Sequence, residues 1–419
     1  MLFEVFIVLP YSQQLERYDL RDRGTRVVRY PSRGPYGEWM ERSRDDDACP
    51  SALQVHRAAD GALARIRLPG GALNAAQLQT LAELADRSGS GTLELTSRGS
   101  VQLRGLPDSP ADHALVAEAV AGVGLLPSPT HERARNIVAS PLSGRLGGLA
   151  DVRPLVRRLD AAIMAAPMLA GLPGRFWFAF DDGRGDVSAL RADAGVQMLG
   201  PDSAALLLCG ADTGIRLPVD DVVPALVTVA ERFLAIREKR WRMTELSDAE
   251  ATSLLAGFPP GTPVTLPHLD DPTPVGWIEQ HDGLIALGAV VPLGVLPART
   301  AEFLAAVLET SGAPMIVTPW RSVLVCDLTE AVADTALQVL PPQGLVFDAD
   351  SPWLRISACV GSPGCERAGA DVRAEAVRAV AAGTAGRLHY VGCERACGSP
   401  ADGAVMVATP DGYLPRIPS

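Results

Sequence analysis

The chain has 419 residues, 47% of them hydrophobic and 21% charged, so it is long and apolar enough to form two or more folded units. Its formal net charge of −11 gives no long-range attraction to phosphate backbones or anionic lipids, so we expect no nucleic acid and no membrane partner. A small-molecule substrate is favoured instead. The opening "MLFEVFIVLP" has no basic region before it and is too short to cross a bilayer, which predicts a cytoplasmic protein.

Residues 1–45 form the first distinct segment. After the opening apolar run they carry no hydrophobic periodicity and are rich in Arg, Asp, Gly, Pro and Tyr. This composition predicts a disordered N-terminal extension, with folded structure from about residue 46.

Two later segments, 61–106 and 283–328, resemble each other. Positions that match without a gap include Pro69 and Pro292, Gly71 and Gly294, Leu81 and Leu304, and Arg98 and Arg321. Each copy has a strand pattern, a helical pattern and two more strand patterns, which predicts a β-α-β-β half of a ferredoxin-like α+β unit. We expect the two halves to pack as one pseudo-symmetric unit, with Arg98 in a pocket and Arg321 in a structural role.

The seven cysteines are an odd number in a chain without a secretory signal, so disulfides are not expected. Cys209 and Cys326 lie in apolar runs, where a free cysteine behaves as a small buried hydrophobe, and Cys49 receives no role. The remaining four form a Cys-x5-Cys pair and a Cys-x3-Cys pair: Cys359, Cys365, Cys393 and Cys397.

The segment between these two pairs predicts how they meet. A helix with Val372, Ala376, Val377 and Val380 on one face is followed by the strand-like "RLHYVG", so two cysteine-bearing loops can surround one inorganic centre. Zinc sites more often have two-residue gaps within their cysteine pairs, whereas iron–sulfur clusters accept wider spacings. An iron–sulfur cluster is favoured, and zinc or four unconnected buried thiols are the alternatives.

The duplication and the cysteine pairs together resemble the sulfite and nitrite reductase superfamily, and within it the precorrin-3B synthase family of cobalamin biosynthesis. Segments that carry the closer match include "DDDACPSALQVHRAADGALARIRLPGG", "LELTSRGSVQLRGL", "ARNIVASPLSG" and "LPGRFWFAFDDGRGDVSALRADAGV". The resemblance implies an α+β fold of duplicated ferredoxin-like half-domains with two sulfite/nitrite-reductase-type iron–sulfur/tetrapyrrole domains. The expected boundaries are 46–125 and 266–335 for the half-domains, 126–265 for the first tetrapyrrole-site domain and 336–419 for the [4Fe-4S]-binding domain.

The same resemblance implies the site. The four cysteines of the two pairs would hold a [4Fe-4S] cluster, and Arg98, Arg135 and Arg175 would surround a tetrapyrrole. Trp177 stands where the superfamily has a second basic residue, which weakens the grip on a small oxyanion.

The residue chemistry agrees with an anionic macrocycle, because guanidinium groups bind carboxylates bidentately. Further candidates for the pocket wall are Gln102 and Arg104, whereas salt bridges compete as the role of Arg133, Arg145 and Arg184. Asp181, Asp182 and Gly183 predict a tight turn.

The activity implied by the resemblance is a monooxygenase that converts precorrin-3A to precorrin-3B by ring hydroxylation with lactone formation, using O2 and electrons from NADH. Because no G-x-G-x-x-G follows a predicted strand, a separate reductase or ferredoxin would donate the electrons. The oxygen-activating centre would be sirohaem, a mononuclear non-haem iron or the substrate beside the cluster. The alternatives are a sirohaem-dependent nitrite or sulfite reductase and a non-catalytic iron–sulfur or zinc protein.

Overall fold

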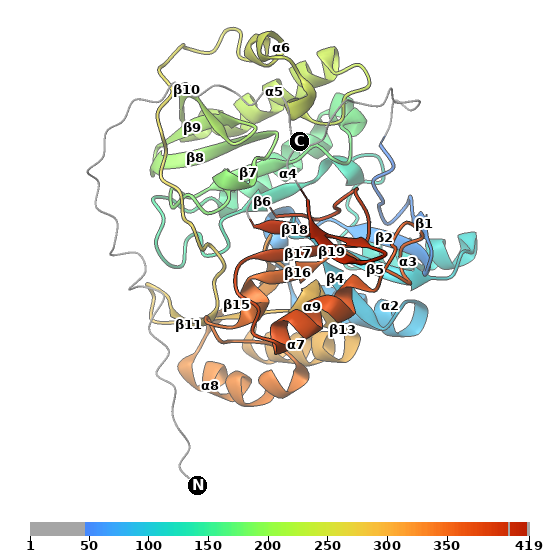
Figure 1. Cartoon of the computed structure of the whole chain (residues 1–419). Helices are drawn as coiled ribbons and strands as arrows, with labels where there is room; N and C mark the ends of the chain where they lie inside the picture. The colour runs from blue at the N-terminus through green and yellow to red at the C-terminus, as the bar shows by residue number, and fades with distance from the viewer. Residues whose placement is uncertain (1–46, 401–402, 417–419) are drawn as a thin grey trace.

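The computed structural model describes residues 47–400 and 403–416 (Figure 1). The predicted N-terminal extension lies outside the described residues. In Figure 1 one α+β domain lies at the top, the helices of the duplicated unit lie at the bottom, and a small C-terminal sheet lies between them. None of the helices in the described residues is both long and apolar enough to span a bilayer.

The duplicated unit consists of two copies with the same order of elements. The first copy contains β1 (His56–Ala58), β2 (Gly61–Ile66), β3 (Ala72–Leu73), α2 (Ala75–Ser88), β4 (Thr92–Leu95), β5 (Val101–Leu106) and α3 (Pro110–Gly122). The second copy contains β11 (Gly276–Glu279), β12 (Ile285–Val290), β13 (Val295–Pro297), α7 (Ala298–Ser311), β14 (Met315–Val317), β15 (Ser322–Leu328) and α8 (Glu330–Val339).

The copies exchange a strand. Their sheets have the orders β1-β2-β5-β4-β13 and β11-β12-β15-β14-β3, so each sheet takes its last strand from the other copy. Leu296 of β13 pairs with Leu93 of β4, and Leu73 of β3 pairs with Met315 of β14. Neither half is complete alone, and the predicted pseudo-symmetric unit is confirmed.

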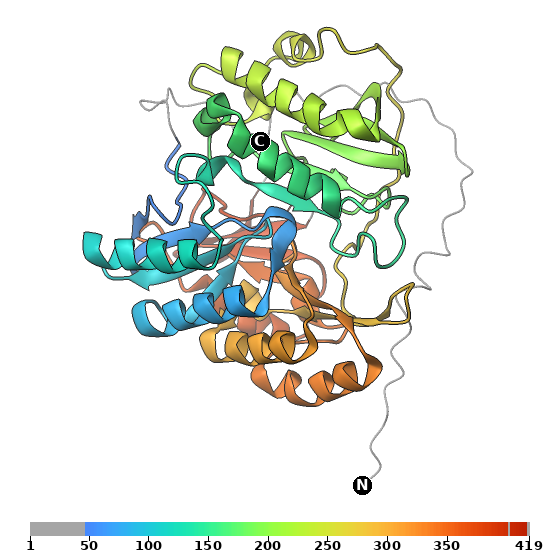
Figure 2. The ribbon, with the colours of Figure 1, turned by 180° about the vertical axis from the view of Figure 1, so that it is seen from behind.

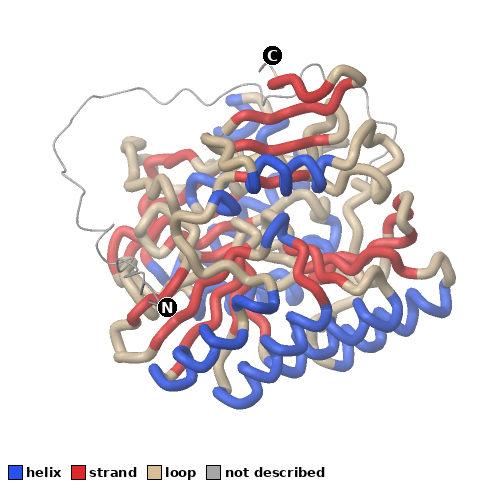
Figure 3. Tube along the Cα trace, turned by 60° about the horizontal axis from the view of Figure 1, so that its bottom comes forward, coloured by secondary structure: helices blue, strands red, loops and turns tan. Residues whose placement is uncertain are grey.

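The helices of the unit cover one face of its sheets, as Figures 2 and 3 show. α2 and α7 pack against each other, and their matched residues Leu81 and Leu304 are both fully buried in one shared core. α8 also contributes Ala333 and Ala336 to this core. The boundary that we expected after residue 335 therefore cuts a helix, and α8 belongs with the second half-domain.

The middle domain is the green domain at the top of Figure 1. It contains β6 (Ile137–Ala139), α4 (Arg153–Ala165), β7 (Phe178–Asp181), β8 (Ala194–Gly200), β9 (Ser203–Leu208), β10 (Ala211–Pro218), α5 (Val222–Ile236) and α6 (Asp248–Ser253). β6, β7 and β8 are parallel, and β9 and β10 continue the sheet antiparallel. The aromatic cluster of Phe176, Phe178 and Phe233 joins this sheet to α5.

The cysteine domain repeats this plan in a shorter form. It contains β16 (Ile356–Ala358), α9 (Val372–Ala381), β17 (Leu388–Val391), β18 (Ala404–Thr409) and β19 (Gly412–Pro415). β16, β17 and β18 are parallel, and β19 is antiparallel. The predicted helix and strand are both present, although α9 buries Val372, Ala376 and Ala379 while Val377 is exposed.

Candidate functional site

The two cysteine pairs lie in neighbouring loops. Cys359 and Cys365 follow β16, and Cys393 and Cys397 follow β17, which is the adjacent parallel strand. The Gly392 N–H donates a hydrogen bond to the Cys359 Sγ at 3.4 Å. Burial raises the pKa of the Cys397 thiol, and Cys359, Cys393 and Cys365 raise it further. The topology therefore gathers the four thiols at one end of the sheet.

The four sulfurs are not gathered as closely as one tetrahedral metal ion would require. Among the described residues, the only set of three or more His, Cys, Asp or Glu ligand atoms within 4.8 Å of one another consists of aspartates, so no three of the sulfurs are that close. Tetrahedral zinc, with Zn–S bonds of about 2.3 Å, would hold its sulfurs roughly 3.8 Å apart. Four thiolates in two loops fit a [4Fe-4S] cluster, and their ligand role remains a prediction.

Arg104 holds the first cysteine loop. Its Nη2 donates to the Gly364 carbonyl at 2.9 Å, and its Nε and Nη2 bind both carboxylate oxygens of Asp60 at 2.9 and 2.8 Å. Glu94 lies 3.8 Å from its Nε. We expected Arg104 in the tetrapyrrole pocket. The structure instead engages its buried guanidinium in ion pairs and in the loop that carries Cys365.

Arg98 is the predicted pocket arginine that keeps free donors. Its Nη1 donates to the Gly174 carbonyl at 3.4 Å, and its guanidinium carbon lies 5.4 Å from the centre of the Trp177 ring. No carboxylate pairs with it among the described residues. Burial and, next, the charge of Arg242 lower the pKa of Arg98 to about 9. This desolvated cation has the electrostatics of a binding site for an anion.

Arg65 and Gln102 belong to a row of polar contacts that leads to the cysteine domain. The Arg65 Nε donates to the Gln102 Oε1 at 3.0 Å, and the Arg65 Nη1 donates to the Cys49 Sγ at 3.4 Å. The Gln102 Nε2 donates to Glu94 at 3.4 Å, and Glu94 is also bound by Arg373 of α9. Gln102 therefore lies in a polar row that runs along the sheet from the arginines to the cysteine loops.

Arg175 and Trp177 line the loop before β7. Arg175 is exposed, its N–H donates to Asp47 at 2.7 Å, and its guanidinium carbon lies 5.2 Å from the Trp241 ring centre. Trp177 is 4% exposed, and its Nε1 has no hydrogen-bond partner among the described residues. Where a second cation was expected, the structure places a buried aromatic ring between Arg98 and Arg242.

Arg135 has a different environment from the one that we expected. Its Nε and Nη2 bind Asp160 of α4 at 2.6 and 2.8 Å, and its Nη1 donates to the Leu125 carbonyl at 3.4 Å. The side chain is buried. A bidentate ion pair within the middle domain therefore engages the guanidinium that we assigned to the tetrapyrrole. The three arginines with competing roles are also paired with carboxylates: Arg133 with Asp47, Arg145 with Asp327, and Arg184 with Asp182.

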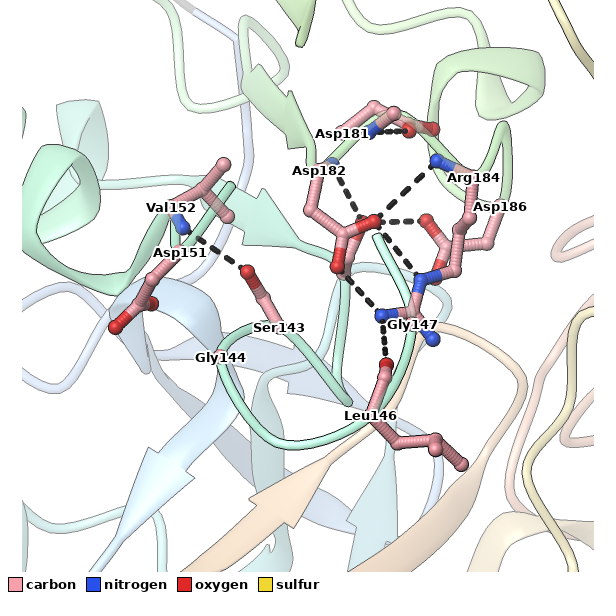
Figure 4. Close-up of polar contacts among 12 residues, drawn as sticks. Ser143, Gly144, Leu146, Gly147, Asp151, Val152, Asp181, Asp182, Arg184 and Asp186 are labelled. Carbon is pink, nitrogen blue, oxygen red and sulfur yellow. Dashed lines mark hydrogen bonds and ion pairs between the residues drawn. The ribbon is translucent and has the colours of Figure 1, made fainter. Parts of the chain in front are cut away.

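A loop rich in aspartate follows β7 (Figure 4). It has the position that the Cys393 loop has after β17. Asp181 accepts hydrogen bonds from the N–H groups of Gly183, Gly185, Val187 and Ser188, which confirms the predicted turn. Asp181, Asp182 and Asp186 form the close carboxylate set. The Arg184 guanidinium binds Asp182 and lies 3.7 Å from Asp186, so this set already has a cation.

The two copies of the duplicated unit match a known family. The model of the nitrite/sulfite reductase ferredoxin-like half domain matches residues 55–115 and 278–341. Both copies are therefore similar to this half-domain. The chain has a mixed α+β fold with duplicated ferredoxin-like half-domains of the nitrite/sulfite reductase type.

Known proteins are similar over most of the chain. A precorrin-3B synthase from Sinorhizobium sp is 27% identical over 383 residues, which span 87% of this chain and 81% of that protein. A ferredoxin–nitrite reductase from Synechococcus elongatus is 26% identical over 388 residues, which span 81% of this chain and 74% of that protein. The NirA structure from Mycobacterium tuberculosis matches with a TM-score of 0.72 at 20% identity. The match covers 84% of this chain and 73% of the NirA chain.

Sequence reasoning missed two arginines of the first half-domain. Arg67 is buried beside Arg65, donates to the Cys49 Sγ at 3.4 Å, and binds the Asn136 Oδ1 at 3.1 Å. Asn136 in turn donates to the Gly174 carbonyl at 3.0 Å. The alternation in "ARIRL" was the available signal, because residues two apart in a strand lie on one face.

Proposed function

We propose that this protein is a monooxygenase of the precorrin-3B synthase type, which converts precorrin-3A to precorrin-3B. The observation that carries the proposal is the Arg98 guanidinium, desolvated, stacked near Trp177 and without a carboxylate partner among the described residues. The similarity to a precorrin-3B synthase over 87% of the chain supports it.

The substrate class follows from the chemistry around Arg98. A precorrin is fringed with acetate and propionate carboxylates, and a guanidinium with free N–H donors binds such groups bidentately. Arg65 and Arg175 add cations from a strand and from a separate loop. The Trp177 ring offers an apolar aromatic surface to a macrocycle, where a second cation would favour a small oxyanion. Together these groups favour a large anionic ring over sulfite or nitrite.

The reaction needs electrons as well as oxygen. One atom of O2 would enter the macrocycle. The other atom would take up two electrons and two protons and leave as water. NADH would supply the electrons through a separate reductase or ferredoxin. The four cysteines would hold a [4Fe-4S] cluster, which carries single electrons when bound. We place the reaction in the cytoplasm, where thiols stay reduced.

In the proposed enzyme the chain's own residues bind the substrate and fix its orientation. Arg98, Arg65 and Arg175 would orient the carboxylates of the substrate, and Trp177 would exclude water from one side of the ring. Gln102 and Glu94 form the polar row between this pocket and the cysteine loops. The substrate would therefore lie close enough to the cysteine domain to receive electrons from it.

A second candidate is a sirohaem-dependent nitrite or sulfite reductase, which the similarity to a ferredoxin–nitrite reductase over 81% of the chain favours. One assay separates the two. Anaerobically purified holoprotein is given precorrin-3A, O2 and an electron donor in one reaction, and sulfite or nitrite with the same donor in another. We expect turnover only in the first, and turnover only in the second would replace the monooxygenase with the reductase. An absorption spectrum completes the test, because sirohaem adds Soret and red bands.

A further inference from the structure

Arg321 contacts the second cysteine loop. Its Nη2 donates a hydrogen bond to the Gly398 carbonyl at 3.1 Å, next to Cys397 in the chain. The Arg321 stem crosses Gly294, where a Cβ atom would lie 2.8 Å from the Arg321 Cδ. The glycine thus provides the space through which the arginine of the second half-domain reaches the cysteine domain. We expected a structural role for Arg321, and the structure places its guanidinium against the loop that carries Cys397.

His389 contacts the same loop from strand β17. It is a fully buried residue of β17, its Nε2 lies 3.0 Å from the Cys397 carbonyl oxygen, and its Nδ1 lies 2.8 Å from the Ser357 Oγ. A carbonyl oxygen only accepts, so Nε2 carries the proton and Nδ1 accepts from the Ser357 hydroxyl. Two consecutive carbonyls, those of Cys397 and Gly398, are therefore fixed by two side chains.

The Arg321 charge also lies within electrostatic reach of the first cysteine loop. Burial lowers the pKa of Arg321, whereas the charges of Glu94 and Cys359 raise it. No carboxylate forms an ion pair with Arg321 among the described residues. A centre bound by the four thiolates would consequently lie close to an arginine charge that no carboxylate contact neutralises.

We infer that Arg321 and His389 are positioning residues for the electron-transfer centre: together they hold the Cys397 loop, and the Arg321 charge raises the reduction potential of the centre. The inference rests on the [4Fe-4S] cluster of the proposed function. A nearby cation favours the reduced cluster because reduction adds one negative charge. The side chains that fix a metal ligand commonly contribute about 10-fold or more to metal retention.

The duplication provides a matched control. Arg98 occupies the equivalent turn of the first half-domain, but it donates to Gly174 of the middle domain and not to a cysteine loop. The same substitution at Arg98 therefore removes the same charge and the same side chain at a position without contact to the cysteines. Arg321→Lys keeps the positive charge on a shorter side chain that has an ammonium group in place of the guanidinium.

The experiment measures the cluster without substrate. Full-length Arg321→Gln, Arg321→Lys and Arg98→Gln proteins are purified anaerobically, their iron and sulfide are counted, and the cluster midpoint potential is titrated by electron paramagnetic resonance. We expect a more negative midpoint and about 10-fold faster iron loss to a chelator in Arg321→Gln. Arg321→Lys should keep most of the wild-type potential, and Arg98→Gln should keep all of it.

Ser357→Ala gives a second, milder measurement. It removes the hydroxyl that fixes His389 without touching the cysteine loops, and we expect faster iron loss with an unchanged midpoint potential. Wild-type potential and iron retention in both Arg321→Gln and Ser357→Ala would overturn the inference, as would a wild-type protein without an iron–sulfur cluster. Substrate turnover is not measured, so a failed precorrin assay counts against the proposed reaction alone.

Discussion

Arg98 and Arg321 occupy equivalent positions in the two half-domains, and each donates a hydrogen bond to a glycine carbonyl in a different domain. The acceptors are Gly174 at 3.4 Å in the middle domain and Gly398 at 3.1 Å in the cysteine domain. The duplicated turn thus serves both domains with the same side chain. Because the surroundings differ, one copy faces Trp177 in the candidate pocket and the other faces the Cys397 loop.

The first prediction separates a binding arginine from a structural one. Arg98→Gln should weaken tetrapyrrole binding by about 1.5–3 kcal/mol, the usual range for a hydrogen bond to a charged group, with little effect on unfolding. Arg135→Gln should lower the free energy of unfolding by about 3 kcal/mol because it leaves Asp160 without its buried partner, and the folded protein should bind normally.

Absorbance titration with a tetrapyrrole and thermal unfolding of both variants check this pair of outcomes. A loss of affinity in Arg135→Gln equal to that in Arg98→Gln, with unchanged thermal stability, would return Arg135 to the pocket. Equal affinity of Arg98→Gln and wild type would remove Arg98 from it.

The second prediction concerns the aromatic wall. Trp177→Lys restores a basic pair with Arg175 and should gain sulfite binding while it loses affinity for the tetrapyrrole. Trp177→Phe is the control, because the Trp177 Nε1 has no partner among the described residues and an aromatic wall remains. We expect that variant to bind a tetrapyrrole nearly as well as wild type. Spectroscopic titration with sulfite and with a tetrapyrrole measures both, and tetrapyrrole affinity preserved in Trp177→Lys would contradict the assigned role.

The repeat predicted the half-domains, because hydrophobic periodicity and matched glycines and prolines are local signals. The exchange of β3 and β13 between the copies could not be predicted from the sequence, since strands of two or three residues carry almost no hydrophobic pattern. The partners of the arginines were also hidden. Arg135 meets Asp160 and Arg104 meets Asp60 through tertiary packing, and a carboxylate dozens of residues away gives no sequence signal.

The third prediction tests the cysteine set. Cys365→Ala removes one of four thiolates and should lower the iron and sulfide content of anaerobically prepared protein, with a bleached or altered cluster spectrum. Cys326→Ala is the control, because burial raises the pKa of that thiol to about 12 and its sulfur lies in an apolar core. Wild-type iron in Cys365→Ala would remove Cys365 from the ligand set, and iron loss in Cys326→Ala alone would relocate the cluster.

The last prediction is a pH dependence in the aspartate loop. Burial, and next the charge of Asp181, raise the pKa of Asp186 well above its usual value, so folded Asp186 keeps a proton that the unfolded chain releases above about pH 4. Stability therefore falls as pH rises from about 4 toward the folded pKa. Asp186→Asn has no proton to release and keeps an oxygen for the Ser140 hydroxyl, which binds Asp186 at 2.6 Å. We expect the Asp186→Asn protein to have a higher melting temperature than wild type near pH 8 and a similar one near pH 4.

Asp151→Asn should show the opposite sign. Although burial raises the pKa of Asp151, hydrogen bonds from Arg153 hold it below the usual value, so this carboxylate stabilises the fold above about pH 4 and loses that contribution as the pH falls. Asp151→Asn should therefore melt below wild type at pH 8 and approach it in acid. Thermal unfolding of the two variants from pH 4 to 8 measures both trends. If Asp186→Asn melted below wild type at pH 8, Asp186 would be an ionised partner of Arg184 in the folded protein, which contradicts the prediction.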